Sequence, residues 1–188
     1  MEKTLTVRKT LFFHTVRTKA AATAVAVVAA VALPQLFHAV GAVSGLGTAL
    51  GETFLPMHLP VLLIGLLAGP AAGLAAGLLG PLVSFALSGM PSALMLPFIM
   101  VELAGYGLVS GLLAGTRIPS FGKLLIAQVA GRALRSVAVL TAVYGFGSQV
   151  AVASIWTSII TGVPGILLQW ALLPLLMFWI ERGVCKHG

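Results

Sequence analysis

Long apolar runs, separated by short polar or glycine-rich segments, fill almost the whole of this sequence of 188 residues. Hydrophobic residues make up 59% of the chain, and Asp, Glu, Lys and Arg together only 8%. Soluble domains carry roughly 25% charged residues, so this chain has too few charges to cover the surface of a water-soluble globule. A lipid bilayer removes that requirement, because about 20 apolar residues cross its hydrocarbon core as a helix. We therefore predict an all-α integral membrane protein.

The runs divide the chain into six predicted transmembrane helices within one membrane domain of residues 1–188. The predicted spans are residues 20–40, 58–69, 71–87, 93–114, 124–146 and 152–180. The second run is short, and 12 residues rise only roughly 18 Å as a helix. Residues 41–57, which precede it, are predicted to form a long loop. We expect either that residues 50–57 also enter the membrane or that the bilayer is thinner there.

The basic residues predict the orientation of these spans. The segments on one side of the predicted topology hold nine of them: Lys3, Arg8, Lys9, Arg17, Lys19, Arg117, Lys123, Arg182 and Lys186. The segments on the other side hold none. Because Lys and Arg concentrate in cytoplasmic loops, we predict that both termini are cytoplasmic and that residues 1–19 form a basic cytoplasmic segment. A signal peptide also begins with basic residues, but so many apolar runs follow that residues 20–40 are interpreted as a membrane helix.

Composition also excludes several classes of function. The chain has no Asp and one cysteine, Cys185, so no paired-Asp catalysis, intrachain disulfide or zinc–thiolate cluster is possible. No glycine-rich phosphate loop is present, so any ATP would be hydrolysed by another protein. Ser44 or Ser110 with His58 is a poor candidate for an intramembrane protease, because nothing orients the pair. The net charge is +7. Most of the basic residues flank the apolar runs, so this charge does not indicate a nucleic-acid-binding protein. We predict no enzymatic activity, no metal site and no cofactor.

Three charged residues fall inside predicted spans. Glu102 lies roughly 13 Å from the outer end of the fourth span, and Arg135 lies roughly 16 Å from the outer end of the fifth, with Arg132 one turn deeper. A charge at the bilayer centre costs roughly 2.5–3.5 kcal/mol on insertion scales, so such residues normally pair and face a bundle interior or a wet cavity. We therefore expect these three residues to lie together.

Their helical spacing suggests a binding site. Arg132 and Arg135 are three residues apart and share one face with Gln128, while Glu102 and Tyr106 share another. If Glu102 pairs with one arginine, the remaining guanidinium is free to bind a carboxylate or phosphate of a ligand. Alternatively, Glu102 bridges both arginines, or one arginine extends toward an interface, and the cluster is structural.

Other polar residues and small residues complete the set of candidates. Glu52 and His58 fall near the outer end of the second span, where His58 is either a structural residue or a ligand contact. Glycines four residues apart, as at Gly65 and Gly69 or Gly73 and Gly77, let helices approach closely. The first span carries a comparable alanine face, Ala22, Ala26 and Ala30, with Ala20 and Ala24 as an alternative register.

Several motifs together resemble one family. The segments 54–63 (FLPMHLPVLL), 88–91 (SGMP) and 102–107 (ELAGYG), with the glycine-rich spans between them, resemble a substrate-binding S component of an energy-coupling factor (ECF) vitamin transporter. The motifs cover residues 51–115, and the length and number of spans match over the whole chain.

This resemblance implies a function and partners. It implies a multi-pass protein of the bacterial plasma membrane that binds a vitamin or vitamin precursor from outside with high affinity. Its partners would be a transmembrane coupling protein, docked on Ala22, Ala26 and Ala30, and two ATPase subunits. The candidate substrate contacts are Glu52, His58, Glu102, Tyr106, Gln128, Arg132 and Arg135. The spare positive charge favours an acidic vitamin such as pantothenate, while pyridoxine-like, pyrimidine and corrin substrates stay open. The alternatives are an autonomous secondary transporter or channel and, with less support, a membrane enzyme or assembly factor.

Overall fold

The computed structural model describes residues 13 and 15–187, with side chains as far as residue 180. This part of the chain is helical and contains no strand. The helices are α1 (Val16–Ser44), α2 (Ala49–Phe54), α3 (His58–Ala68), α4 (Pro70–Ser88), α5 (Leu96–Leu113), α6 (Ser120–Phe146), α7 (Ser154–Thr161) and α8 (Val163–His187). Most of the predicted basic segment, residues 1–19, and the side chains of Arg182, Cys185 and Lys186 lie outside the described residues.

Six helical segments are long and apolar enough to cross a membrane. They are Val16–Ser44, Ala49–Ala68, Pro70–Ser88, Leu96–Leu113, Ser120–Phe146 and Val163–Ile180. Large apolar side chains such as Val28 (67% exposed), Leu36 (60%) and Trp179 (70%) cover the outside of the bundle. An outer surface of this kind suits lipid and not water, so the predicted all-α membrane protein with six spans is confirmed.

The predicted loop over residues 41–57 is wrong at its start, where residues 41–44 continue α1, and in its second half. Residues Ala49–Phe54 form α2, which ends at Leu55 in the left-handed conformation (φ 49°) and continues through Pro56 into α3. Together α2 and α3 make one segment of 20 residues. Residues 49–57 therefore lengthen the second span. This agrees with the expectation that residues 50–57 enter the membrane, and no thinner bilayer is needed.

The predicted sixth span over residues 152–180 is also wrong as one helix. It divides at Gly162 into α7 and α8. A Cβ atom at Gly162 would lie 2.8 Å from an Arg132 nitrogen and 2.9 Å from Leu55, and one at Gly165 would lie 2.6–2.7 Å from the backbone of α2. The two glycines thus allow α2 and Arg132 to pack directly against the chain where α7 gives way to α8.

Glycines also explain the close packing of the central helices. The backbones of Gly73 on α4 and Gly107 on α5 contact each other, so that a Cβ on either would collide with the other. Gly77 packs against the backbone of Leu103, and Gly65 on α3 packs against Ser110. The expectation that these regularly spaced glycines let helices approach closely is confirmed.

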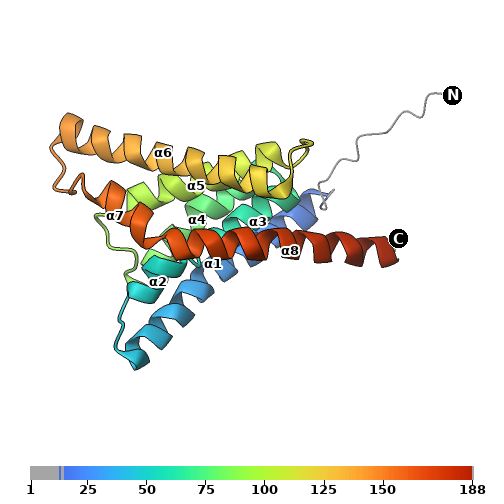
Figure 1. The fold of residues 1–188 in the computed structure, drawn as a ribbon, viewed down its shortest axis with the longest axis horizontal. Helices are drawn as coiled ribbons and strands as arrows, with labels where there is room; N and C mark the ends of the chain where they lie inside the picture. The colour runs from blue at the N-terminus through green and yellow to red at the C-terminus, as the bar shows by residue number, and fades with distance from the viewer. Residues whose placement is uncertain (1–12, 14, 188) are drawn as a thin grey trace.

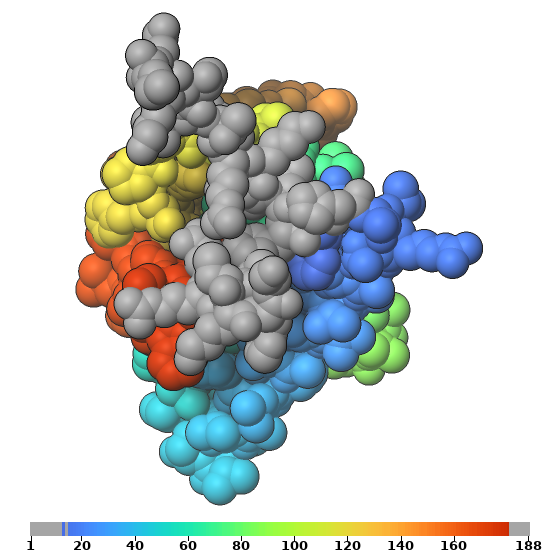
Figure 2. Space-filling view, turned by 90° about the vertical axis from the view of Figure 1, so that its right-hand side faces the viewer, coloured from blue at the N-terminus to red at the C-terminus, as the bar shows by residue number. Residues whose placement is uncertain are grey.

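The two ends of the bundle differ. In Figure 1 the start of α1, the connection between α5 and α6, and the end of α8 lie at one end. The connections between α1 and α2 and between α6 and α7 lie at the other, where α1 slants away from the remaining helices. Seen from the first end, α1 in blue and α8 in red lie on opposite sides of the molecule (Figure 2).

Candidate functional site: a polar cavity at one end of the bundle

A cavity of about 620 Å³ is lined by residues of α1 to α7 and of the connections between α4 and α5 and between α6 and α7. It lies toward the end of the bundle opposite the end of α8 (Figure 1). Cavities that bind small molecules measure roughly 300–1,000 Å³ and combine apolar walls with a few convergent polar groups. Met57, Met95 and Ile99 supply apolar surface here, and Glu52, His58, Glu102, Arg132 and Arg135 supply polar groups.

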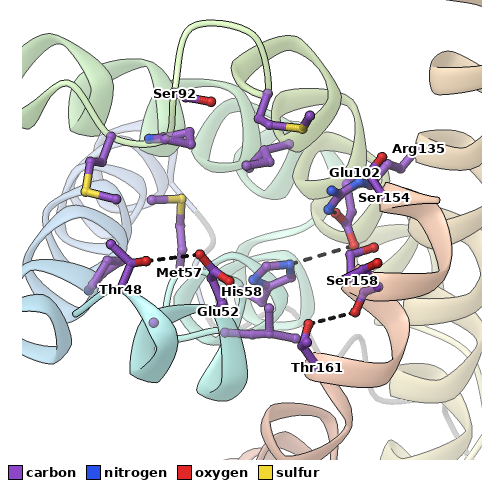
Figure 3. Close-up of a pocket in the computed structure, with 18 of the residues that line it drawn as sticks. Thr48, Glu52, Met57, His58, Ser92, Glu102, Arg135, Ser154, Ser158 and Thr161 are labelled. Carbon is purple, nitrogen blue, oxygen red and sulfur yellow. Dashed lines mark hydrogen bonds and ion pairs between the residues drawn. The ribbon is translucent and has the colours of Figure 1, made fainter. Parts of the chain in front are cut away.

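Glu102 is the centre of a buried ionic cluster. Its side chain is 1% exposed, its Oε2 accepts a hydrogen bond of 2.7 Å from Nη1 of Arg135, and its Oε1 lies 3.2 Å from Nε of Arg132. The Tyr106 hydroxyl, one turn further along α5, donates to Oε1 at 2.8 Å. Nε2 of His58 lies 3.9 Å from the same oxygen (Figure 3). The structure thus brings together the three intramembrane charges as expected, with Glu102 contacting both arginines.

Glycines place this cluster at the contact of α5 and α6. A Cβ at Gly131 would collide with the Tyr106 ring and lie 2.7 Å from the Glu102 carbonyl oxygen, and one at Gly105 would lie 3.1 Å from Gly131. Because neither residue carries a side chain, the two helices approach closely enough for Arg135 to reach Glu102. Spacing along each helix then brings Tyr106 and Arg132 to the same carboxylate.

The two guanidinium groups have unused hydrogen-bonding capacity. Nη1 of Arg132 donates to the backbone oxygen of Ser158 at 2.7 Å. Nε and Nη2 of Arg132 and Nε of Arg135 are buried without a hydrogen-bond partner among the described residues. The 3.2 Å contact of Arg132 with Glu102 is an ion pair without hydrogen-bond geometry. Two guanidinium groups facing one carboxylate leave one positive charge, and buried N–H groups of this kind favour a further acceptor.

Glu52 lies on α2 and is exposed at the cavity, where its Oε1 accepts a hydrogen bond of 3.1 Å from the Thr48 hydroxyl. In Figure 3 Thr48 and Glu52 lie on one side of the cavity and Arg135 and Ser154 on the other. The carboxylate of Glu52 is therefore separate from the Glu102 cluster.

Two of the predicted substrate contacts do not line this cavity. Tyr106 lies behind Glu102 and packs against the His58 ring, with ring centroids 5.2 Å apart. Gln128 is buried in the first half of α6. Its amide NH₂ donates to the Gln169 side-chain oxygen at 2.8 Å, and its own side-chain oxygen accepts from the Trp170 indole at 2.7 Å. Gln128 thus links α6 to α8 and Tyr106 orients Glu102, so both lie outside direct reach of a ligand in this cavity.

The alanine face of α1 is partly covered within the chain itself. Ala30 is fully buried, and a Cβ at Gly80 of α4 would lie 3.1 Å from its methyl group. Ala22 and Ala26 line an apolar groove between α1 and α3, away from the polar cavity. The alternative register, Ala20 and Ala24, is exposed.

The contribution of α7 to the cavity was not predicted from the sequence. Ser154, Thr157, Ser158 and Thr161 all line the cavity, whereas Trp156 and Ile160 are each 68% exposed on another side of the helix. The spacing of the four hydroxyl residues, i, i+3, i+4 and i+7, is typical of one helical face. That pattern is present in the sequence, but residues 152–180 are so apolar as a whole that they predict one continuous span.

A comparison with protein families supports one assignment. The family model described as "ECF transporter, substrate-specific component" matches residues 20–177, which is most of the chain. No curated protein and no solved structure matches the chain.

Proposed function

The chain belongs to the family of substrate-specific components of ECF transporters, and from this premise we propose that it binds a vitamin or vitamin precursor with an anionic group, such as pantothenate. The observation that carries the proposal is that two arginines line the cavity, Arg132 and Arg135, while one carboxylate, Glu102, balances both of them. A planar guanidinium binds a carboxylate or phosphate through two parallel hydrogen bonds. Such a group would neutralise the positive charge that remains after Glu102 is shared by both arginines.

The distribution of charge supports an orientation with the cavity facing outside. Arg117 lies in the connection between α5 and α6, and Lys123 lies in the first turn of α6. This connection is at the end of the bundle where α1 starts and α8 ends (Figure 1). The connections at the cavity end carry no Lys or Arg. Since basic loops stay in the cytoplasm, we infer that both termini are cytoplasmic, that the cavity opens to the exterior, and that the membrane is the bacterial plasma membrane.

We further propose that transport is driven by ATP through a coupling protein and two ATPase subunits, and not by the chain alone. The test is uptake of radiolabelled pantothenate by proteoliposomes that contain either the chain alone or the complete ECF complex. Uptake is expected only with the complete complex and ATP. Gradient-driven uptake by the chain alone would instead support the rival function, an autonomous secondary transporter. No uptake by the complete, ATP-supplied complex would remove pantothenate as the substrate.

The groove between α1 and α3 is the proposed docking site of the coupling protein. Ala22 is partly exposed there and is distant from the polar cavity, whereas Ala30 is already covered by α4. Replacement Ala22→Leu fills the groove with a larger side chain, which a close helix contact does not tolerate. We expect it to abolish ATP-dependent uptake while substrate binding by the isolated chain persists. Normal uptake by this variant would contradict the proposed docking site.

A further inference from the structure

The hydroxyl groups of α7 form a wall of hydrogen-bond acceptors. The Thr157 hydroxyl donates to the Ala153 carbonyl oxygen at 3.0 Å, that of Ser158 to Ile155 at 2.9 Å, and that of Thr161 to Thr157 at 2.8 Å. A hydroxyl has one hydrogen to donate. Once that hydrogen is used by a backbone carbonyl, the oxygen can only accept a further bond from the cavity.

The opposite wall has the same character. The Thr48 hydroxyl donates its hydrogen to Glu52, and an ionised carboxylate such as Glu52 is itself only an acceptor. The arginines, in contrast, are only donors. The described lining is therefore divided into a donor pole at Arg132 and Arg135 and acceptor walls on α7 and α2 (Figure 3). The two histidines and the hydroxyl groups of Ser84, Ser92 and Ser154 also line the cavity, can donate or accept, and add no constraint.

The separation of donor groups from acceptor groups excludes more substrates than the positive charge of the arginines does alone. We propose that the cavity selects a monoanionic molecule that carries several hydroxyl or amide N–H groups along its chain, and that Thr157 and Thr161 are specificity-determining residues. The inference rests on the proposed function, because it assumes that the anionic group binds at the arginines. A second anionic group would approach the Glu52 carboxylate and be repelled, so dianions are disfavoured. The methionines and Ile99 provide apolar contact for the carbon skeleton.

The test is the thermal stabilisation of the chain in lipid nanodiscs by a panel of matched compounds. Pantothenate, biotin and gluconate are carboxylates that bear O–H or N–H donors. Octanoate and lipoate are carboxylates without them, and panthenol replaces the carboxylate of pantothenate by a hydroxymethyl group. We expect at least one donor-bearing carboxylate to raise the melting temperature, and octanoate and lipoate to have little effect.

The outcomes separate the inference from the proposed function. Stabilisation by octanoate or lipoate as large as that by the best donor-bearing carboxylate would overturn the inference while leaving the anion site intact. Panthenol as effective as pantothenate, if pantothenate binds, would instead overturn the anion site. If no donor-bearing carboxylate stabilises the chain, the inference is wrong.

Variants of the wall provide a second, independent readout. Thr157→Val and Thr161→Val keep the shape of the side chain and remove the acceptor oxygen. Each is expected to weaken binding of the best donor-bearing carboxylate roughly 3- to 10-fold, which corresponds to the loss of one hydrogen bond, and Thr157→Ser should restore most of it. Thr141→Val, an exposed position on α6 outside the cavity, is the matched control and should leave affinity unchanged. Unchanged affinity in both wall variants would contradict the inference.

Discussion

Glu102 is the residue on which the interior of this membrane protein most depends. Its carboxylate contacts two guanidinium groups and a tyrosine hydroxyl at 2.7–3.2 Å while remaining 1% exposed. In a medium of low dielectric constant, each of these charges is costly unless its partner is present. The carboxylate therefore allows both arginines to stay largely buried, with side chains 11% and 13% exposed, and a ligand anion would complete the balance of charge.

The replacement Glu102→Gln is expected to destabilise the protein by about 3–5 kcal/mol, because it leaves two buried guanidinium groups without a counter-charge. The measurement is the free energy or the midpoint of unfolding in detergent. Glu52→Gln is the matched control, since the exposed Glu52 balances no buried arginine, and its stability should stay within about 0.5 kcal/mol of the wild type. Equal stability of the two variants would show that the cluster does not hold the bundle together.

The residues of this cluster were largely predictable from the sequence, but their contacts were only partly so. Their depth in the membrane and helical spacing indicated that Glu102, Arg132 and Arg135 would meet. The bond from Arg132 to the Ser158 backbone could not be predicted, because it depends on the break at Gly162 that turns α7 toward the cavity. Gln128 shares the spacing of the arginines, yet its partners on α8 keep it within the helix packing.

At the scale of helices, glycine determines which elements touch. α4 and α5 approach until the backbones of Gly73 and Gly107 are in contact. Without a hydrophobic driving force between helices in lipid, such close packing is a principal source of association. The pattern of small residues was visible in the sequence, but which helices they would join was not, because spacing along one helix does not identify its partner.

Gly107→Ala is expected to destabilise the protein by about 1–3 kcal/mol, because the added methyl group collides with the backbone of α4 and forces the helices apart. Gly145→Ala is the matched control within α6. A Cβ there would meet only a Thr141 methyl group at 3.9 Å, so the better helix propensity of alanine should leave stability unchanged or raise it by up to about 1 kcal/mol. A thermal unfolding series of both variants checks this, and a neutral Gly107→Ala would contradict the packing described here.

The elements around the cavity were the hardest to predict. The segments α2 and α7 are short, and each is followed by a longer apolar helix. The break after α2 is at Leu55, which has a positive φ, and the break after α7 is at Gly162. Hydropathy averaged over a whole span does not detect such breaks, so the sequence predicts a loop for the first segment and part of a continuous helix for the second. Both line the polar cavity, so the shape of this cavity depends on irregular structure.

At the scale of the whole molecule, the polar cavity and the apolar groove are separate. The cavity lies toward one end of the bundle, whereas the groove between α1 and α3 is lined by residues from the first half of α1, near its start. A substrate-binding subunit that also docks on a partner protein needs two surfaces that can be occupied independently. The number of spans could be predicted from the apolar runs of the sequence, because it follows from the thickness of the bilayer and not from packing.

The most direct test of this account is mass spectrometry of the ligand that co-purifies with the wild type and with Arg132→Gln and Arg135→Gln, together with their melting temperatures. We predict that the wild type retains an anionic ligand and that at least one variant loses it. The ligand-free stability of that variant should hold or rise, because the variant removes the unbalanced charge. A neutral or cationic ligand, or two variants that lose stability but keep the ligand, would contradict the claim that the arginines bind the substrate.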